Sequence, residues 1–284
     1  GKELLGKNQF ALYQKLQSDL RNLKDIQPKN HVLSVREPGQ NAPKTFVFKR
    51  GSPHSPADEV QPHFPVILTD KKPIITPRKN SSGRRRAFAE WLVNDNPQTA
   101  RVMANRIWQF HFGRGIVRSA NNFGNQGDRP THPKLLNYIA ASFKNNDWSI
   151  KKLHKLIMTS ATYRMSSKGN KDYYTADPAN DLFWRFNMRR LTGEELRDSI
   201  LAVIGKLDLS HGGPSVFPTV SREVLAGQST IKWKNGPEPH QYRRSVYTFQ
   251  MRSLIYPLVE SFDAASPDSS CAVRFQTTLP TQAL

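Results

Sequence analysis

The sequence predicts a mostly α fold, with a helical core and short-stranded or irregular flanks. Three observations predict it. Between residues 81 and 205, apolar side chains recur at spacings of three and four, and several of these segments begin with a capping residue. Six prolines between residues 51 and 77 exclude a regular helix there. Beyond residue 205, glycines, prolines and short runs of β-forming residues predominate.

The individual elements follow from the same signals. Leu12, Leu16 and Leu20 predict an amphipathic helix over residues 3–25. Strands are predicted at residues 45–48 and 245–250. The core helices are predicted at 83–93, from 96 to a stop at Gly113, from 131 to 143, from a cap at Asp147 or Ser149 to 158, and after Thr192. This pattern divides the chain into a helical arm (1–30), a strand with a proline-rich strap (31–80) and a helical domain (81–284).

The composition restricts the class of partner. Lys and Arg number 42 against 23 Asp and Glu, a formal charge of +19, so a long-range partner is expected to be anionic, and nucleic acid, acidic glycan and anionic lipid all qualify. Nucleic acid ranks below a glycan because no helix-turn-helix, zinc-finger or RNA-binding signature is present. Cys271 is the only cysteine, which excludes an internal disulfide and a c-type haem attachment in this chain. No apolar run is long enough to predict a membrane span.

One long motif is the most distinctive part of the sequence. It runs Asn-Arg-Ile-Trp-Gln-Phe-His-Phe-Gly-Arg-Gly-Ile-Val over residues 105–117, and further motifs lie at 122–124, 130–133, 160–164 and 243–247. Together they resemble the planctomycete-specific domain one family, whose members are domains of unknown function at the C-terminal end of large proteins.

The resemblance implies a setting and supplies no activity. Members of the family are typically exported, so a periplasmic or other extracytoplasmic location at the cell envelope is expected. They often carry an N-terminal cytochrome c-like domain, so haem c is expected only on a separate domain of the parent protein, and no cofactor is expected in this chain. The other domains of that parent are expected partners. The family usually continues past Leu284, so the domain is expected to be truncated at its C-terminus.

Four arginines form the main candidate binding site. Arg101, Arg106, Arg114 and Arg118 lie in one predicted helix and its exit turn, and guanidinium groups bind carboxylate, sulfate or phosphate bidentately. The alternative is that they pair with carboxylates and fasten helices together. The carboxylates considered for that role are those of Glu90, Asp128, Glu194, Glu195 and Asp198.

Five other residues complete the candidate ligand-binding set: Trp108, His111, Asn122, His132 and Trp233. The two histidines are weak evidence for a metal or haem site because no acidic residue stands at a suitable spacing, so structural hydrogen bonding is favoured and no metal is predicted. Trp233 lies between Lys232 and Lys234 and is expected to be exposed for stacking. No catalytic residue can be identified.

The leading hypothesis is a recognition module that binds an anionic macromolecule, such as an acidic polysaccharide, outside the cytoplasm. One alternative is the catalytic domain of a carbohydrate-active oxidoreductase or hydrolase that works with a cytochrome c-like domain. Another is a structural module of an envelope assembly. Whether the chain is an enzyme stays open at this point.

Overall fold

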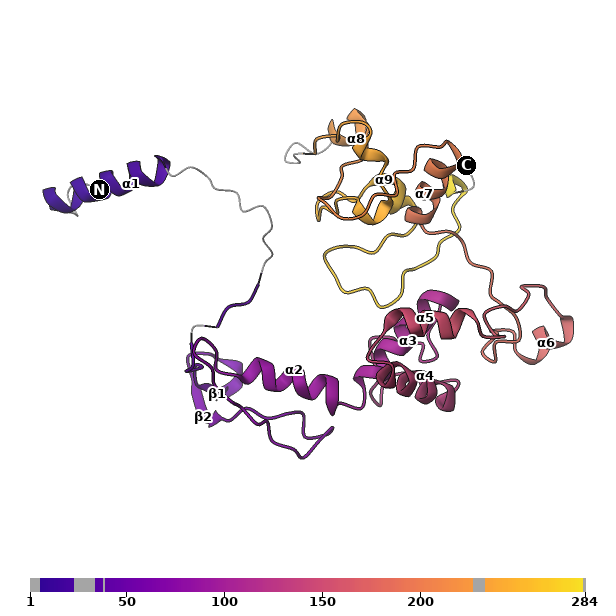
Figure 1. The fold of residues 1–284 in the computed structure, drawn as a ribbon, viewed down its shortest axis with the longest axis horizontal. Coiled ribbons are helices and arrows are strands. Elements are labelled where there is room, and N and C mark those ends of the chain that lie inside the picture. Colours follow the sequence, from indigo (N-terminus) through magenta and orange to yellow (C-terminus); the bar gives the residue numbers. More distant parts are fainter. Residues whose placement is uncertain (1–5, 23–33, 38, 227–232, 283–284) are drawn as a thin grey trace. The chain divides into compact units, whose positions relative to one another are not determined.

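The computed structural model describes residues 6–22, 34–37, 39–226 and 233–282 (Figure 1). The contacts divide the chain into two units, residues 1–94 and 95–284. Within the described ranges helices predominate, and the only sheet is a two-stranded ribbon. None of the helices in these ranges has the length and apolarity needed to cross a bilayer. This division at residue 94 does not test the predicted boundaries between arm, strap and helical domain at residues 30 and 80, which remain predictions.

The first unit begins with α1 (Lys7–Asn22), which lies inside the predicted range of 3–25. Its apolar stripe is exposed, at 57% for Leu12, 58% for Leu16 and 70% for Leu20. The predicted amphipathic helix is therefore confirmed over the residues that the structure describes. Leu23 lies outside them.

A hairpin follows in the same unit. β1 (Thr45–Phe48) was predicted, and it pairs antiparallel with β2 (Pro56–Val60), with Thr45 opposite Val60. A short 3-10 turn, Lys49–Gly51, connects them. β2 was missed because its segment is rich in proline. Pro56 is the first residue of the strand, a position where the missing N–H is tolerated.

α2 (Arg84–Asn94) closes the first unit and begins where its serine cap predicts. The carboxylate of Glu37 accepts hydrogen bonds from the backbone N–H of Ser82 (2.7 Å) and from its hydroxyl (3.2 Å). Phe64, from the proline-rich strap, stacks on Trp91 with ring centroids 4.7 Å apart. The strap is thus packed against the helix that follows it.

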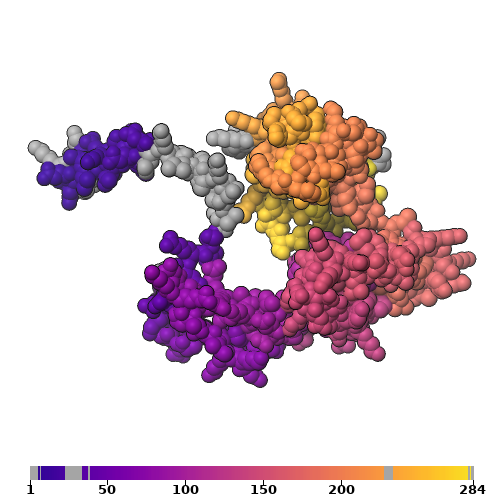
Figure 2. All heavy atoms as spheres, viewed as in Figure 1, coloured from indigo at the N-terminus to yellow at the C-terminus, as the bar shows by residue number. Residues whose placement is uncertain are grey.

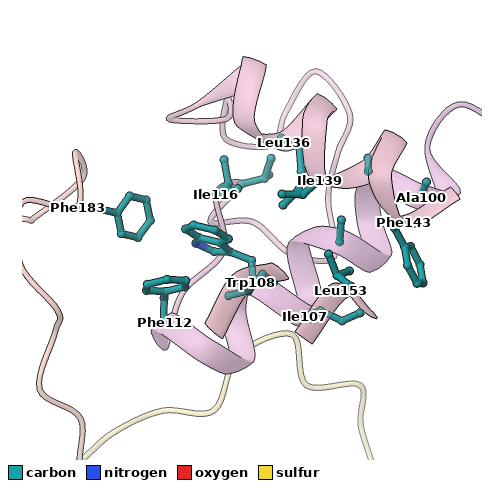
Figure 3. Packing of buried hydrophobic residues seen from close by; sticks show 14 residues of the cluster. Ala100, Ile107, Trp108, Phe112, Ile116, Leu136, Ile139, Phe143, Leu153 and Phe183 are labelled. Carbon is teal, nitrogen blue, oxygen red and sulfur yellow. The ribbon is translucent and has the colours of Figure 1, made fainter. Parts of the chain in front are cut away.

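Three predicted helices form the first core of the second unit: α3 (Thr99–Phe112), α4 (Pro133–Asn145) and α5 (Ile150–Met158). α3 ends at Gly113, whose φ of 79° favours glycine. The Ser149 hydroxyl caps α5 by accepting from the N–H of Lys152. Figure 3 shows how side chains of these helices interdigitate around Trp108, with Phe183 reaching in from a later loop.

The remaining helices are shorter, apart from α7 (Gly193–Val203), which has the predicted start at Thr192 with a complete capping box to Glu195. The others were not predicted: α6 (Lys171–Ala176), α8 (Arg222–Ala226) and α9 (Pro257–Ser261), with 3-10 turns at His240–Tyr242, Ser245–Tyr247 and Pro280–Gln282. Val220, Trp233 and Leu254 form a second, smaller buried cluster.

The strand predicted at 245–250 is wrong, because this segment begins with the 3-10 turn Ser245–Tyr247. The buried Arg197 guanidinium donates to the carbonyl of Arg243 and to the Ser245 hydroxyl. Asp198 accepts from both the N–H and the hydroxyl of Ser245, at 2.8 and 2.7 Å. Side chains of α7 therefore hold the start of this segment, while its later part forms a single parallel bridge between Thr248 and Val216.

The turn after α3 is held by one buried amide. Asn105 is fully buried, its Nδ2 donates to the Val117 carbonyl (2.9 Å), and its Oδ1 accepts from the Val117 N–H (2.8 Å). A Cβ at Gly115 would lie 2.6 Å from Asn105 Nδ2, so the residue at this position must be glycine for the amide to fit. The chain then returns to the core through Ile116 and Val117, both buried.

Asn105→Ala is expected to lower the free energy of unfolding by roughly 3 kcal/mol, because two buried backbone groups of Val117 lose their partners. Asn145→Ala, at an exposed position of α4, is the matched control and is expected to change stability by no more than about 0.5 kcal/mol. Urea unfolding followed by circular dichroism measures both. Equal stability of the two variants would contradict the role given to Asn105.

Candidate functional site

The positive charge of the second unit is concentrated in residues 99–165, which we call the helical subdomain and which comprise α3, α4, α5 and their connections. This stretch contains eleven Lys and Arg against two Asp and Glu, a net charge of +9. Residues 166–284 contain fourteen against twelve, so they are close to neutral. Most of the predicted site residues belong to the charged part.

Arg114 and Arg118 lie in the exit turn of α3 and share one carboxylate. Arg114 Nη1 lies 3.3 Å from Asp181 Oδ1, and Arg118 pairs with the same oxygen. Arg114 also donates to the Asn180 carbonyl, and burial lowers its pKa, with repulsion from Arg118 as a smaller cause. Pairing of these arginines with carboxylates was considered from the sequence, but Asp181 was not among the carboxylates named there. The partner predicted for Arg114 and Arg118 was therefore wrong.

Arg101 and Arg106 have amide partners. Arg101 Nη1 donates to Asn137 Oδ1 of α4, and Arg106 Nη2 donates to Asn121 Oδ1 at 2.6 Å. Within the described residues no carboxylate lies at ion-pair distance from either guanidinium. An amide oxygen orients a guanidinium without neutralising it, so both side chains keep their net charge for a ligand.

Four of the five carboxylates considered as their partners are engaged elsewhere. Glu90 pairs with Arg86, Glu194 with Arg274, Glu195 with Arg189, and Asp198 with Arg197. The two hydrogen bonds from Arg189 are the largest cause that lowers the pKa of Glu195 to about 2. Glu194 is thus tied to the segment that carries Arg274, and Asp198 to its neighbour Arg197 in α7.

The two candidate histidines have different partners. His111 Nε2 and His154 Nδ1 share a hydrogen bond of 2.7 Å, and Tyr163 packs edge-on against the His111 ring. His132 Nδ1 lies 3.1 Å from the Thr131 hydroxyl. In the part of the chain that the structure describes, no group of three or more His, Cys, Asp or Glu side chains is arranged to hold a metal ion.

The remaining candidates have structural contacts. Trp108 is 3% exposed and stacks on Phe112 in the first core. Trp233 is 6% exposed and its Nε1 donates to the Pro218 carbonyl, so the expectation of an exposed stacking residue is wrong. Asn122 accepts from the N–H of Gly124 and shapes the following loop.

Sequence reasoning missed a second cationic surface on α5. Lys151, Lys152 and Lys155 are exposed, while Leu153 and Ile157 of the same helix are buried. Residues 151 and 155 are four apart and residues 152 and 155 three apart, so the three lysines are neighbours on the helix surface. They occupy the side of α5 that does not face the core. The spacing of basic and apolar residues in this segment was a sufficient signal.

The histidine pair predicts a pH dependence of stability. Burial, followed by the charge of His154, lowers the pKa of His111 from its ordinary 6.5. The unfolded chain therefore takes up a proton that the folded chain resists, and the free energy of unfolding should fall as the pH is lowered from about 7.5 through the ordinary histidine pKa. Urea unfolding at a series of pH values measures this, and both His111→Gln and His154→Gln should flatten the decline. A decline unchanged in both variants would contradict it.

Comparisons with known proteins place the chain in a family. The model of the family described as PSD1, protein of unknown function (DUF1553), matches residues 84–284. No curated protein and no solved structure shows significant similarity to the chain. The match begins at α2, includes every helix of the second unit and covers well over half of the sequence. The chain therefore belongs to the PSD1 family of proteins of unknown function.

Proposed function

We propose that this chain is a recognition module that binds an anionic macromolecule, specifically an acidic polysaccharide, through its helical subdomain. The observation that carries the proposal is the net charge of +9 on residues 99–165 beside a nearly neutral remainder of the same unit. Excess charge that merely keeps a protein soluble has no reason to collect in one part of it.

The partners of the arginines support the same proposal. In residues 166–284, Arg189, Arg190 and Arg274 each have a carboxylate partner, and the charges cancel locally. In the helical subdomain, Arg101 and Arg106 are held by asparagine oxygens and keep their charge. A guanidinium that is already oriented loses less conformational freedom when it binds a carboxylate or sulfate.

The lysines of α5 extend the cationic surface. Lys151, Lys152 and Lys155 are strongly hydrated point charges on flexible stems, which suits contacts with a repeating polyanion. A chain with many anionic groups can engage the arginines of α3 and these lysines in succession, so individually weak contacts add up.

The choice of a glycan over nucleic acid comes from the sequence. The motifs resemble those of exported proteins, and an extracytoplasmic setting makes acidic polysaccharide the abundant polyanion. We accordingly place the chain at the cell envelope, in a parent protein that carries haem c, where present, on a separate domain. Duplex DNA then becomes the control polyanion of the binding test.

The test compares two triple variants that remove the same charge. Lys151→Gln with Lys152→Gln and Lys155→Gln changes the helical subdomain, and Arg222→Gln with Lys234→Gln and Arg252→Gln changes exposed sites outside it. Affinity for polygalacturonate at physiological salt should fall about tenfold in the first variant, since three exposed charge contacts of about 0.5 kcal/mol each add up to about 1.5 kcal/mol. It should be unchanged in the second.

Isothermal titration calorimetry with polygalacturonate, dextran sulfate, neutral dextran and duplex DNA measures the effect. Equal losses in both variants would show that net charge alone drives binding and would contradict the proposal. Tighter binding to DNA than to either acidic glycan would reassign the partner.

A further inference from the structure

A cavity of about 420 Å³ lies within the second unit, between α3, the start of α7 and the segment 265–276. Figure 2 shows the yellow C-terminal part of the chain lying between the helical core and the orange segments. Gln109 of α3 donates to the Ala272 carbonyl (3.0 Å), and Arg274 pairs with Glu194 of α7, so this segment is tied to both walls. The volume is in the range of small-molecule sites.

The α3 wall presents three kinds of group. Arg106 contributes a guanidinium that donates to the amide oxygen of Asn121. Gln109 Oε1 is buried and accepts no hydrogen bond from the described residues, so it is an acceptor that a ligand hydroxyl would satisfy. Phe110 is 76% exposed at the lip, which leaves its ring free to stack.

The opposite wall is polar and electrically balanced. Arg189 is bound by both carboxylate oxygens of Glu195, at 2.6 and 2.7 Å, and Arg274 is bound by both oxygens of Glu194 at 2.8 Å. Each pair is neutral as a whole. Arg106 therefore supplies the uncompensated charge among the described lining residues, and the cavity favours a ligand with a single negative group.

We propose that this cavity binds one uronic acid residue, a sugar ring that carries a single carboxylate. Arg106 takes the carboxylate, Gln109 Oε1 accepts from a ring hydroxyl, and Phe110 stacks on a face of the ring. The inference rests on the proposed function in its choice of a carbohydrate, and it names the unit of the polysaccharide that is read. The lysines of α5 supply general attraction, whereas the cavity supplies selectivity for a carboxylated sugar.

Cys271 provides the test because it lines the cavity, is exposed and is the only cysteine in the chain. Its alkylation by iodoacetamide, a neutral reagent, is followed by mass spectrometry with glucuronate or glucose at equal concentration. Glucuronate should slow the reaction in proportion to occupancy, to about one half of the free rate at the dissociation constant. Glucose should not.

Two arginine variants sharpen the result. Arg106→Gln should abolish the protection of Cys271, whereas Arg252→Gln, which changes an exposed guanidinium outside the helical subdomain and the cavity, should retain it. Absent protection by glucuronate, equal protection by glucose, or protection that survives Arg106→Gln would each overturn the inference.

The result is separable from that of the polysaccharide titration. Protection of Cys271 without polygalacturonate binding would support the cavity and remove the role of the helical subdomain. Polygalacturonate binding without protection of Cys271 would support the role of the helical subdomain and remove that of the cavity.

Discussion

The structure of the second unit depends on the buried amide of Asn105. Its two hydrogen bonds to Val117 reverse the chain directly after α3 and leave room only for glycine at position 115. Ile116 and Val117 are thereby placed in the core, and the Ile116 carbonyl accepts from the N–H of Thr131 just before α4. The same reversal sets Arg114 and Arg118 beside the loop that carries Asp181. The buried Asn105 amide therefore positions both the apolar residues that complete the core and the arginines of the exit turn.

The two parts of the second unit, residues 99–165 and 166–284, differ more in net charge than in secondary structure. The later residues use arginine to fasten segments, as in the pairing of Arg190 with Asp263, and their charges cancel. The helical subdomain has only two carboxylates of its own. Arg101 and Arg106 are held by asparagine side chains, Arg114 and Arg118 share the Asp181 carboxylate from outside it, and the lysines of α5 are exposed. This distribution is costly through self-repulsion, and a polyanionic partner would relieve it.

Local signals predicted most of the fold. The caps at Ser149 and Thr192 and the glycine stop at residue 113 gave the starts and ends of long helices, because each depends on a few neighbouring residues. Short helices such as α6 and α9 lacked a long apolar period. The segment after residue 245 looked like a strand but became a turn through its contacts with Arg197 and Asp198, about 47 residues away in sequence.

The candidate site was less predictable because it also depends on contacts between residues that are far apart in the sequence. Composition and the α3 motif drew attention to the arginines, but Asp181, Asn121 and His154 reach them or their neighbours from separate loops and helices. Trp233 was misread because flanking lysines suggest exposure, while the indole itself packs edge-on against Phe217 and donates to a backbone carbonyl. Charged neighbours in the sequence do not show whether the side chain between them is buried.

The central claim is that the polyanion is held mainly by the helical subdomain, and not by the segments that carry α8 and α9. Hydrogen–deuterium exchange read by mass spectrometry, with and without saturating polygalacturonate at physiological salt, tests it most directly. The account predicts that slowed exchange is concentrated in peptides of α3, its exit turn and α5, while peptides of α8 and α9 exchange as in the free protein. Slowed exchange concentrated in α8 and α9, or an even change across all peptides, would contradict it.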